Sequence, residues 1–170
     1  MAGATSKTSR WKRVVLKLSG EALAESTGFG LDSDVLHQIA TEVHETRRDL
    51  DVDIAVVVGG GNFWRGREGS MSGMDATQSD HIGMLGTVMN ALALQSALEA
   101  ENIQCIVQSA IEMKNVAEPF IRRKANRLLS EGNIVIFAAG TGSPFFSTDT
   151  TSALRASEMS ADAIMKATMV

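Results

Sequence analysis

Short apolar runs alternate along this chain with longer segments whose apolar residues recur every three or four positions. The apolar runs lie at residues 14–18, 54–58, 103–108, 134–139 and 162–170, and the helix-like segments at residues 32–48, 79–101, 121–131 and 150–159. A run that is apolar throughout, such as residues 54–58, is typical of a parallel strand covered on both faces. The alternation predicts right-handed β-α-β crossovers, and hence an α/β fold: a three-layer αβα sandwich with a mainly parallel sheet.

Length and charge narrow the class of protein. The 170 residues fit one domain, which we expect at residues 13–170 behind a flexible, polar and basic tail at residues 1–12. A net charge of −4 disfavours nucleic-acid binding, which usually needs a basic surface, but it leaves nucleotides open. The single cysteine, Cys105, excludes an internal disulfide and fits a reducing cytoplasm. The sequence lacks both an apolar signal-peptide core and a run of about 20 apolar residues, so we expect a cytoplasmic protein without a membrane partner.

Three glycine-rich turns follow three of the predicted strands. They are Lys17-Leu18-Ser19-Gly20, Gly59-Gly60-Gly61 and Gly140-Thr141-Gly142. Open α/β sheets bind ligands beyond the carboxyl ends of their strands, where bare backbone N–H groups form anion sites. One such turn is equally well explained as a tight connection, but three at equivalent positions favour phosphate binding. Neither G-x-x-x-x-G-K-[ST] nor G-x-G-x-x-G is present, which disfavours P-loop kinases and Rossmann dehydrogenases.

Two lysines lie near the ends of otherwise apolar strands. Lys17 is near the end of the first predicted strand, and Lys166 has a similar place in the last. Phosphoryl transfer needs alignment and positive charge around the moving group, which two ammonium groups from neighbouring strands would supply. For either lysine alone, an edge-strand side chain reaching water is at least as good an explanation.

Five segments carry a resemblance to a known family. They are VLKLSGEAL at residues 15–23, GGGNFWRG at 59–66, DHIGML with VMN at 80–90, GTGSPFFSTD at 140–149 and KATMV at 166–170. They resemble the motifs of bacterial uridylate (UMP) kinases, members of the amino acid kinase superfamily, over a match from about Trp11 to Val170. The first segment alone suggests the superfamily, whereas the third and fourth are specific to UMP kinases. The resemblance implies the amino acid kinase fold and transfer of the γ-phosphoryl group of ATP to UMP, giving UDP and ADP in pyrimidine nucleotide biosynthesis.

The resemblance also implies roles for individual residues. The catalytic group would be Lys17, Asp149 and Lys166, with Asp149 holding the lysines in place and Asp162 a weaker candidate for that supporting role. Residues that would hold ATP and phosphates are Lys17, Leu18, Ser19, Gly20, Gly61, Arg65 and Thr168. Residues that would hold UMP are Gly60, Asp80, Thr141, Gly142, Ser143, Pro144, Phe145, Phe146, Ser147 and Thr148.

Simpler explanations remain open for several of these residues. Arg65 can bind phosphate oxygens through its planar fork, or it can be a solvated loop arginine. Asp80 can accept from both hydroxyls of a ribose, or it can be a helix cap or first-turn acid. Phe145 and Phe146 can border a base, although aromatic residues beside a strand end are more often core. Asp149 can be only an N-cap of the helix that follows it.

The resemblance further implies a homohexamer that GTP activates and UTP inhibits. The segment resembling the GTP-responsive region is Glu25, Ser26, Thr27, Gly28, Phe29 and Gly30. No dense carboxylate cluster predicts a dedicated metal site, so Mg²⁺ is expected to arrive with ATP. Family members continue beyond the position of Val170, so we expect that the C-terminal part of the fold, which completes the ATP site, is missing from this chain. The alternatives are another superfamily member acting on a carboxylate or carbamate, and a non-catalytic nucleotide-binding fragment.

Overall fold

The computed structural model describes residues 9–24, 28–66 and 73–167, and the structural statements below concern this part of the chain. It contains a six-stranded sheet in the order β4-β3-β5-β2-β1-β6, and every neighbouring pair is parallel. The strands are β1 (Arg13–Leu18), β2 (Asp53–Val58), β3 (Cys105–Ser109), β4 (Glu118–Pro119), β5 (Ile134–Ala138) and β6 (Ala163–Ala167). The predicted α/β architecture with a parallel sheet is confirmed.

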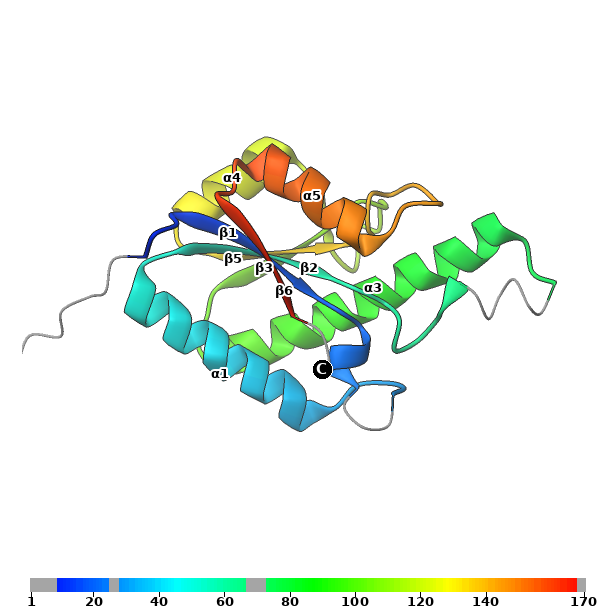
Figure 1. Ribbon diagram of the computed structural model, residues 1–170, viewed down its shortest axis with the longest axis horizontal. Helices are drawn as coiled ribbons and strands as arrows, with labels where there is room; N and C mark the ends of the chain where they lie inside the picture. The colour runs from blue at the N-terminus through cyan, green and yellow to red at the C-terminus, as the bar shows by residue number, and fades with distance from the viewer. Residues whose placement is uncertain (1–8, 25–27, 67–72, 168–170) are drawn as a thin grey trace, which may run out of the picture.

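Helices cover both faces of this sheet (Figure 1). One face carries α1 (Ser33–Leu50) and α3 (Ala76–Ala100), and the other carries α4 (Arg122–Ser130) and α5 (Thr148–Met159). Alternate residues of each central strand belong to two separate buried clusters: Val56 packs with the α1 and α3 side, and Val57 with the α4 and α5 side. Burial on both faces explains why these strands are apolar throughout.

Local signals in the sequence set most helix boundaries. Asp32 caps α1, because its side chain accepts hydrogen bonds from the backbone N–H groups of Asp34 and Val35. Gly132 follows α4 with a φ of +84°, as expected of a residue that ends a helix in the left-handed conformation. Helix α3 begins three residues earlier than predicted, because Asp75 accepts from the N–H of Gln78 and supplies the cap.

Two short elements were not predicted. A single turn of 3-10 helix, η1 (Glu21–Leu23), follows β1, and β4 adds a two-residue strand at the edge of the sheet. Strand β4 includes Pro119 and has no apolar run, so periodicity gives no signal for it. Cys105 is buried in β3, and burial raises the pKa of its thiol to about 12.

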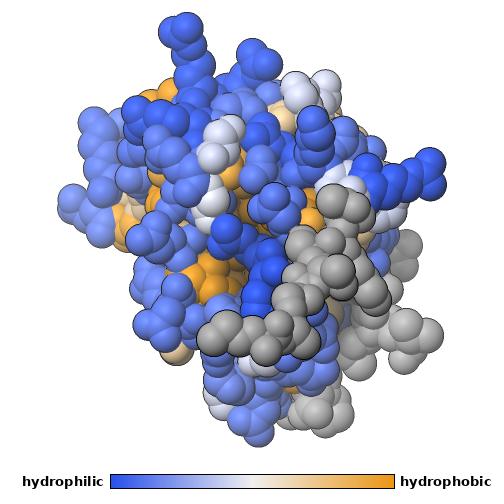
Figure 2. All heavy atoms as spheres, turned by 90° about the vertical axis from the view of Figure 1, so that its left-hand side faces the viewer, coloured by the Kyte–Doolittle hydropathy of each residue, from blue (hydrophilic) through white to orange (hydrophobic). Residues whose placement is uncertain are grey.

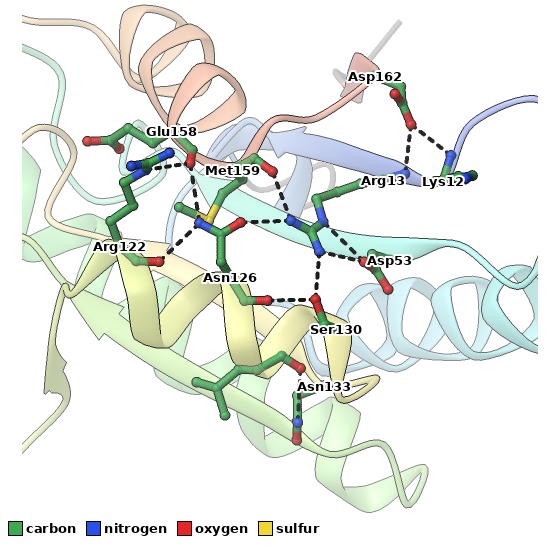
Figure 3. A network of polar contacts seen from close by, with 11 residues as sticks. Lys12, Arg13, Asp53, Arg122, Asn126, Ser130, Asn133, Glu158, Met159 and Asp162 are labelled. Carbon is green, nitrogen blue, oxygen red and sulfur yellow. Dashed lines mark hydrogen bonds and ion pairs between the residues drawn. The ribbon is translucent and has the colours of Figure 1, made fainter.

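A polar network ties the amino ends of the strands together (Figure 3). The guanidinium of Arg13 in β1 donates to the Asp53 carboxylate, to Asn126 Oδ1 in α4 and to the carbonyl of Met159 at the end of α5. The Asp162 carboxylate accepts from the backbone N–H groups of Lys12 and Arg13. The idea that Asp162 supports the two lysines is therefore wrong, since its hydrogen bonds hold the opposite edge of the sheet.

One face of the molecule is largely hydrophilic, with apolar recesses (Figure 2). Figure 2 shows hydrophobic residues mainly in hollows between hydrophilic ones on the face that it presents. A cavity of about 760 Å³ lies against α1, β1 and β6, and its lining includes Trp11, Leu16 and Met165. No helix in the described ranges is both long and apolar enough to cross a membrane.

Candidate active site

Lys17 and Lys166 are direct neighbours across the parallel strands β1 and β6. The Lys17 side chain is buried, with 7 % of the residue exposed, and its Nζ lies 3.3 Å from Asp149 Oδ1. The Nζ of Lys166 lies 3.0 Å from the other oxygen, Oδ2. A single carboxylate from the first turn of α5 thus bridges two ammonium groups from adjacent strands.

The surroundings of Asp149 favour its charged form. The hydrogen bond from Lys166 is the largest cause that lowers the pKa of Asp149. Burial opposes it, and the hydrogen bond and charge of Lys17 lower the pKa further. Its place in the first turn of α5 also suits a negative charge. The cap of this helix is Ser147, which accepts from the N–H of Thr150, so Asp149 is not the N-cap.

The first and second glycine turns lie against each other beyond the carboxyl ends of β1 and β2. A Cβ atom at Gly20 would lie 2.5 Å from the backbone nitrogen of Gly61, so only glycine fits there. A Cβ atom at Gly60 would lie 2.5 Å from the carbonyl oxygen of Gly83 in α3. These close approaches bring the backbone of both turns and of α3 to one place, as the phosphate-site interpretation requires.

A cavity of about 300 Å³ joins the second turn to the third. This volume is at the lower end of the range for small-molecule sites. Its lining contains eight of the predicted ligand-binding residues, namely Gly60, Gly61, Asp80, Ser143, Pro144, Phe146, Ser147 and Thr148. Thr141, Gly142 and Phe145 are not part of this lining. Phe145 and Phe146 are 71 % and 59 % exposed, so the alternative that they are core residues is wrong.

Asp80 lies inside α3 as its fifth residue, because the helix begins at Ala76. The alternative that it is a cap or first-turn acid is therefore wrong. Its Oδ2 instead accepts a hydrogen bond of 2.6 Å from the backbone N–H of Phe145. Phe145 has a φ of +70°, a backbone conformation that residues other than glycine rarely adopt. This bond joins the third glycine loop to α3 across the cavity that both line.

Arg65 is paired with an acid that we did not predict. Its Nη2 lies 3.5 Å from Glu21 Oε1, and Glu21 also lies beside Gly61, where a Cβ atom would contact its carboxylate. Arg65 is half exposed at this place. The motif that includes Glu21 carried no signal for this contact, because the two residues are far apart in sequence.

Some predicted site residues lie outside the described ranges, or next to their ends. Thr168, Glu25, Ser26 and Thr27 lie outside the described residues, as do residues 1–8 of the expected tail. The exposed Phe29 makes an edge-to-face contact with Phe63, with ring centroids 6.0 Å apart. Within the described ranges, no group of three or more His, Cys, Asp or Glu side chains could hold a metal ion.

Comparison with known proteins supports one family. The family model described as "Amino acid kinase family" matches residues 12–170. The chain belongs to the amino acid kinase family. Its membership agrees with the parallel sheet and with the glycine turns at the carboxyl edge.

Relatives of this amino acid kinase carry a more specific name. This chain is 59 % identical over 158 residues to the uridylate kinase of Pediococcus pentosaceus, and 60 % identical over 156 residues to that of Limosilactobacillus reuteri. These matches cover 93 % and 92 % of this chain and 65 % of each relative. The solved UMP kinase of Bacillus anthracis superposes with a TM-score of 0.89 at 43 % identity, over 94 % of this chain and 65 % of that one. The chain thus spans about 65 % of the length of the relatives that it matches.

Proposed function

We propose that this amino acid kinase transfers the γ-phosphoryl group of ATP to UMP, giving UDP and ADP. The observation that carries the proposal is the bridge from Asp149 to Lys17 and Lys166, one residue away from the cavity that Thr148 lines. The names of the relatives support UMP as the acceptor.

The two lysines suit the charge that moves in this reaction. With Asp149 ionised, two ammonium groups and one carboxylate leave one net positive charge in the cluster. Phosphoryl transfer asks the protein mainly for positioning and for positive charge near the transferring oxygens. Lys17 is the buried member of the pair, so its charge acts where water screens it least.

The cavity suits a mononucleotide acceptor. Gly60 and Gly61 offer backbone N–H groups to a phosphate, and Asp80 offers a carboxylate to a ribose diol. Ser147 and Thr148 add hydroxyl groups on the side of the α5 N-terminus, which favours an anion. Arg65 pairs with Glu21, which lies beside Gly61, so in this proposal it binds phosphate there once it leaves Glu21.

The proposal includes further features for which the motif resemblance is the support. These are Mg²⁺ carried with ATP, a homohexamer, activation by GTP, inhibition by UTP and a cytoplasmic location. The two lysines and one carboxylate do not resemble a protein cage for Mg²⁺, which suits an ion that keeps its phosphate and water ligands. That ion would supply charge neutralisation between the phosphates of ATP.

A coupled assay of ADP formation on this 170-residue chain tests the proposal. We expect turnover with ATP, Mg²⁺ and UMP, and none with glutamate or carbamate as acceptor. Turnover with glutamate or carbamate but not UMP would replace the proposal with another activity of the superfamily. Lys114→Ala is a matched control for variants of the site, because Lys114 is an exposed lysine paired with Glu112.

Titration calorimetry separates the remaining alternative. UMP binding without ADP formation, also in a version extended with the additional third of a relative, would favour a non-catalytic nucleotide-binding fragment. Activity that appears only in the extended version would assign the acceptor side to this chain and part of the ATP side to the extension.

A further inference from the structure

Two buried asparagines form a reciprocal amide pair behind the second glycine turn. Asn62 follows the turn and is 1 % exposed, and Asn90 lies in α3 and is fully buried. The Nδ2 of Asn62 donates to Asn90 Oδ1 at 2.9 Å, and the Nδ2 of Asn90 donates to Asn62 Oδ1 at 2.7 Å. Neither residue lines the 300 Å³ cavity, so neither is placed to contact a ligand there.

The second N–H of each amide reaches a different backbone segment. Asn90 donates to the carbonyl oxygen of Gly59 at 2.6 Å, and Asn62 donates to the carbonyl oxygen of Gly30 at 2.6 Å. The backbone N–H of Gly30 also donates to the carbonyl of Asn62, at 3.0 Å. The pair therefore joins α3, the second glycine turn and the segment that contains Gly30.

The bond to Gly59 fixes the direction of a group that lines the cavity. A trans peptide unit is planar, and its C=O and N–H point in opposite directions. Because Asn90 holds the Gly59 carbonyl, it also fixes where the N–H of Gly60 points. Gly60 lines the cavity, and in the proposed function its N–H is one of the groups that would bind a phosphate.

The pair has one well-defined arrangement. Both amide groups use both N–H donors, and each side-chain oxygen accepts from the partner. In a buried site an unpaired amide is costly, so partial or alternative pairings are disfavoured. The first turn is close as well, since a Cβ atom at Gly20 would lie 2.6 Å from Asn62 Oδ1.

We propose that Asn62 and Asn90 are positioning residues for the phosphoryl transfer. Their amide pair sets the direction of the Gly60 N–H and couples it to the position of Gly30. This inference rests on the proposed function for its kinetic consequence, but the coupling itself is a property of the nucleotide-free protein. A change in the position of Gly30 would thus alter the 300 Å³ cavity through the side chains of Asn62 and Asn90.

Amide hydrogen exchange of the glycines tests the coupling without any nucleotide. We expect Asn90→Ala and Asn62→Ala each to speed exchange at both Gly30 and Gly59 by about tenfold or more, relative to amides of β5. The matched control is Asn126→Ala, which removes an amide from the network at the opposite edge of the sheet and should leave both glycines unchanged relative to β5. If Asn90→Ala speeds exchange at Gly59 but leaves Gly30 as in the wild type, the coupling is disproved.

Kinetics test the positioning role. A small misplacement of a binding group can cost about 10²-fold in rate, so we expect kcat/KM for UMP to fall by about that factor in Asn62→Ala and Asn90→Ala. The double variant should be no worse than the poorer single variant, because each amide acts through the other. Asn126→Ala should lose stability and keep its kcat/KM.

Asn90→Asp provides a variant of the same shape. It replaces the two donors with an oxygen that faces the Gly59 carbonyl and Asn62 Oδ1, so we expect the same loss of kcat/KM in folded protein. Wild-type kcat/KM in folded Asn90→Asp and Asn62→Ala would overturn the positioning role. Absence of UMP turnover in the wild type and in its extended version, with the expected exchange pattern, would instead refute the proposed function and leave the coupling intact.

Discussion

At the scale of single residues, the site depends on one carboxylate shared by two lysines. Asp149 separates the Nζ atoms of Lys17 and Lys166, which would otherwise repel each other across adjacent strands. The carboxylate also holds both cations without neutralising both. A phosphoryl group that enters the cluster therefore meets an excess positive charge that is already aligned.

Removing the buried ammonium group should affect the reaction more than binding. For Lys17→Ala we expect kcat to fall by about 10² to 10³-fold, because its charge matters most in the transition state, while the Kd for UMP changes by less than about threefold. Steady-state kinetics and calorimetry measure the two quantities, with Lys114→Ala as the control. An equal change in kcat and in UMP affinity would contradict a transition-state role for Lys17.

Asp80 should mainly affect how tightly the acceptor, UMP, binds. In Asp80→Asn the carboxylate that would accept from a ribose diol is lost, so we expect the Kd for UMP to rise by about tenfold, as the loss of a charged hydrogen bond predicts. The same change weakens the bond from the Phe145 N–H, so the exchange of that amide should also become faster. An unchanged Kd would remove Asp80 from UMP binding, whatever happens at Phe145.

At the scale of elements, the sequence predicts strands and turns better than it predicts contacts between them. The strands β1, β2 and β5 were evident because residues buried on both faces must be apolar. The sequence placed Lys17 and Lys166 near strand ends, and the pairing of β1 with β6, which periodicity does not give, puts them side by side. The Asn62–Asn90 pair had no such signal, because its partners are joined only by the packing of α3 against the sheet.

The start of α3 illustrates another limit. Apolar periodicity pointed to Ser79, but the first turn is polar and its cap is the side chain of Asp75. A helix boundary set by a single side-chain hydrogen bond changes the role assigned to every nearby residue. For that reason a cap or first-turn role was considered for Asp80, although it lies one turn inside the helix.

The third glycine turn permits a test with a matched pair of glycines. Gly142 and Gly73 both have positive φ, +83° and +77°, so alanine at either position should cost about 1–2 kcal/mol. A Cβ atom at Gly142 would also lie 2.9 Å from the carbonyl oxygen of Ala110, whereas at Gly73 it would meet none of the described residues within 4 Å. We therefore expect Gly142→Ala to lower the free energy of unfolding by about 1–3 kcal/mol more than Gly73→Ala.

Urea unfolding of both glycine variants gives the difference, and calorimetry with UMP adds a second readout. Only Gly142→Ala should also weaken UMP binding, because its turn leads into the loop that lines the cavity. Equal losses of stability for the two variants would mean that the turn moves freely away from Ala110.

At the scale of the whole molecule, the carboxyl ends and the amino ends of the strands, called here the carboxyl edge and the amino edge, have different roles. The carboxyl edge brings together glycine turns, two lysines and a cavity, whereas the amino edge is closed by Arg13, Asp53 and Asp162. The order β4-β3-β5-β2-β1-β6 could not be read from periodicity, because any of the apolar strands could have been central. The sequence did predict at which end of the strands the site lies, since ligands bind beyond the carboxyl ends of the strands in such sheets.

This division predicts how the fold responds to acid. Hydrogen bonds from the N–H groups of Arg13 and Lys12 are the largest causes that lower the pKa of Asp162, and Lys166 is the largest cause that lowers the pKa of Asp149. A carboxyl group whose pKa is lower in the folded state stabilises the protein fully above its ordinary value of about 3.9, and this stabilisation is lost as the pH falls through the folded value. The free energy of unfolding should therefore be steady from about pH 5 to 7 and decline below about pH 4.

Urea unfolding at several pH values from 3 to 7 measures this decline in the wild type and in two variants. Asp162→Ala should be less stable than the wild type at pH 7 and should lose less stability between pH 5 and pH 3, because one of the responsible groups is gone. Asp149→Asn should also show a shallower decline, but with a large loss of turnover, since its carboxylate holds both lysines. Identical acid slopes in Asp162→Ala and the wild type would show that the bonds from Lys12 and Arg13 do not favour the charged carboxylate, and that the amino edge is held by the Arg13 side chain instead.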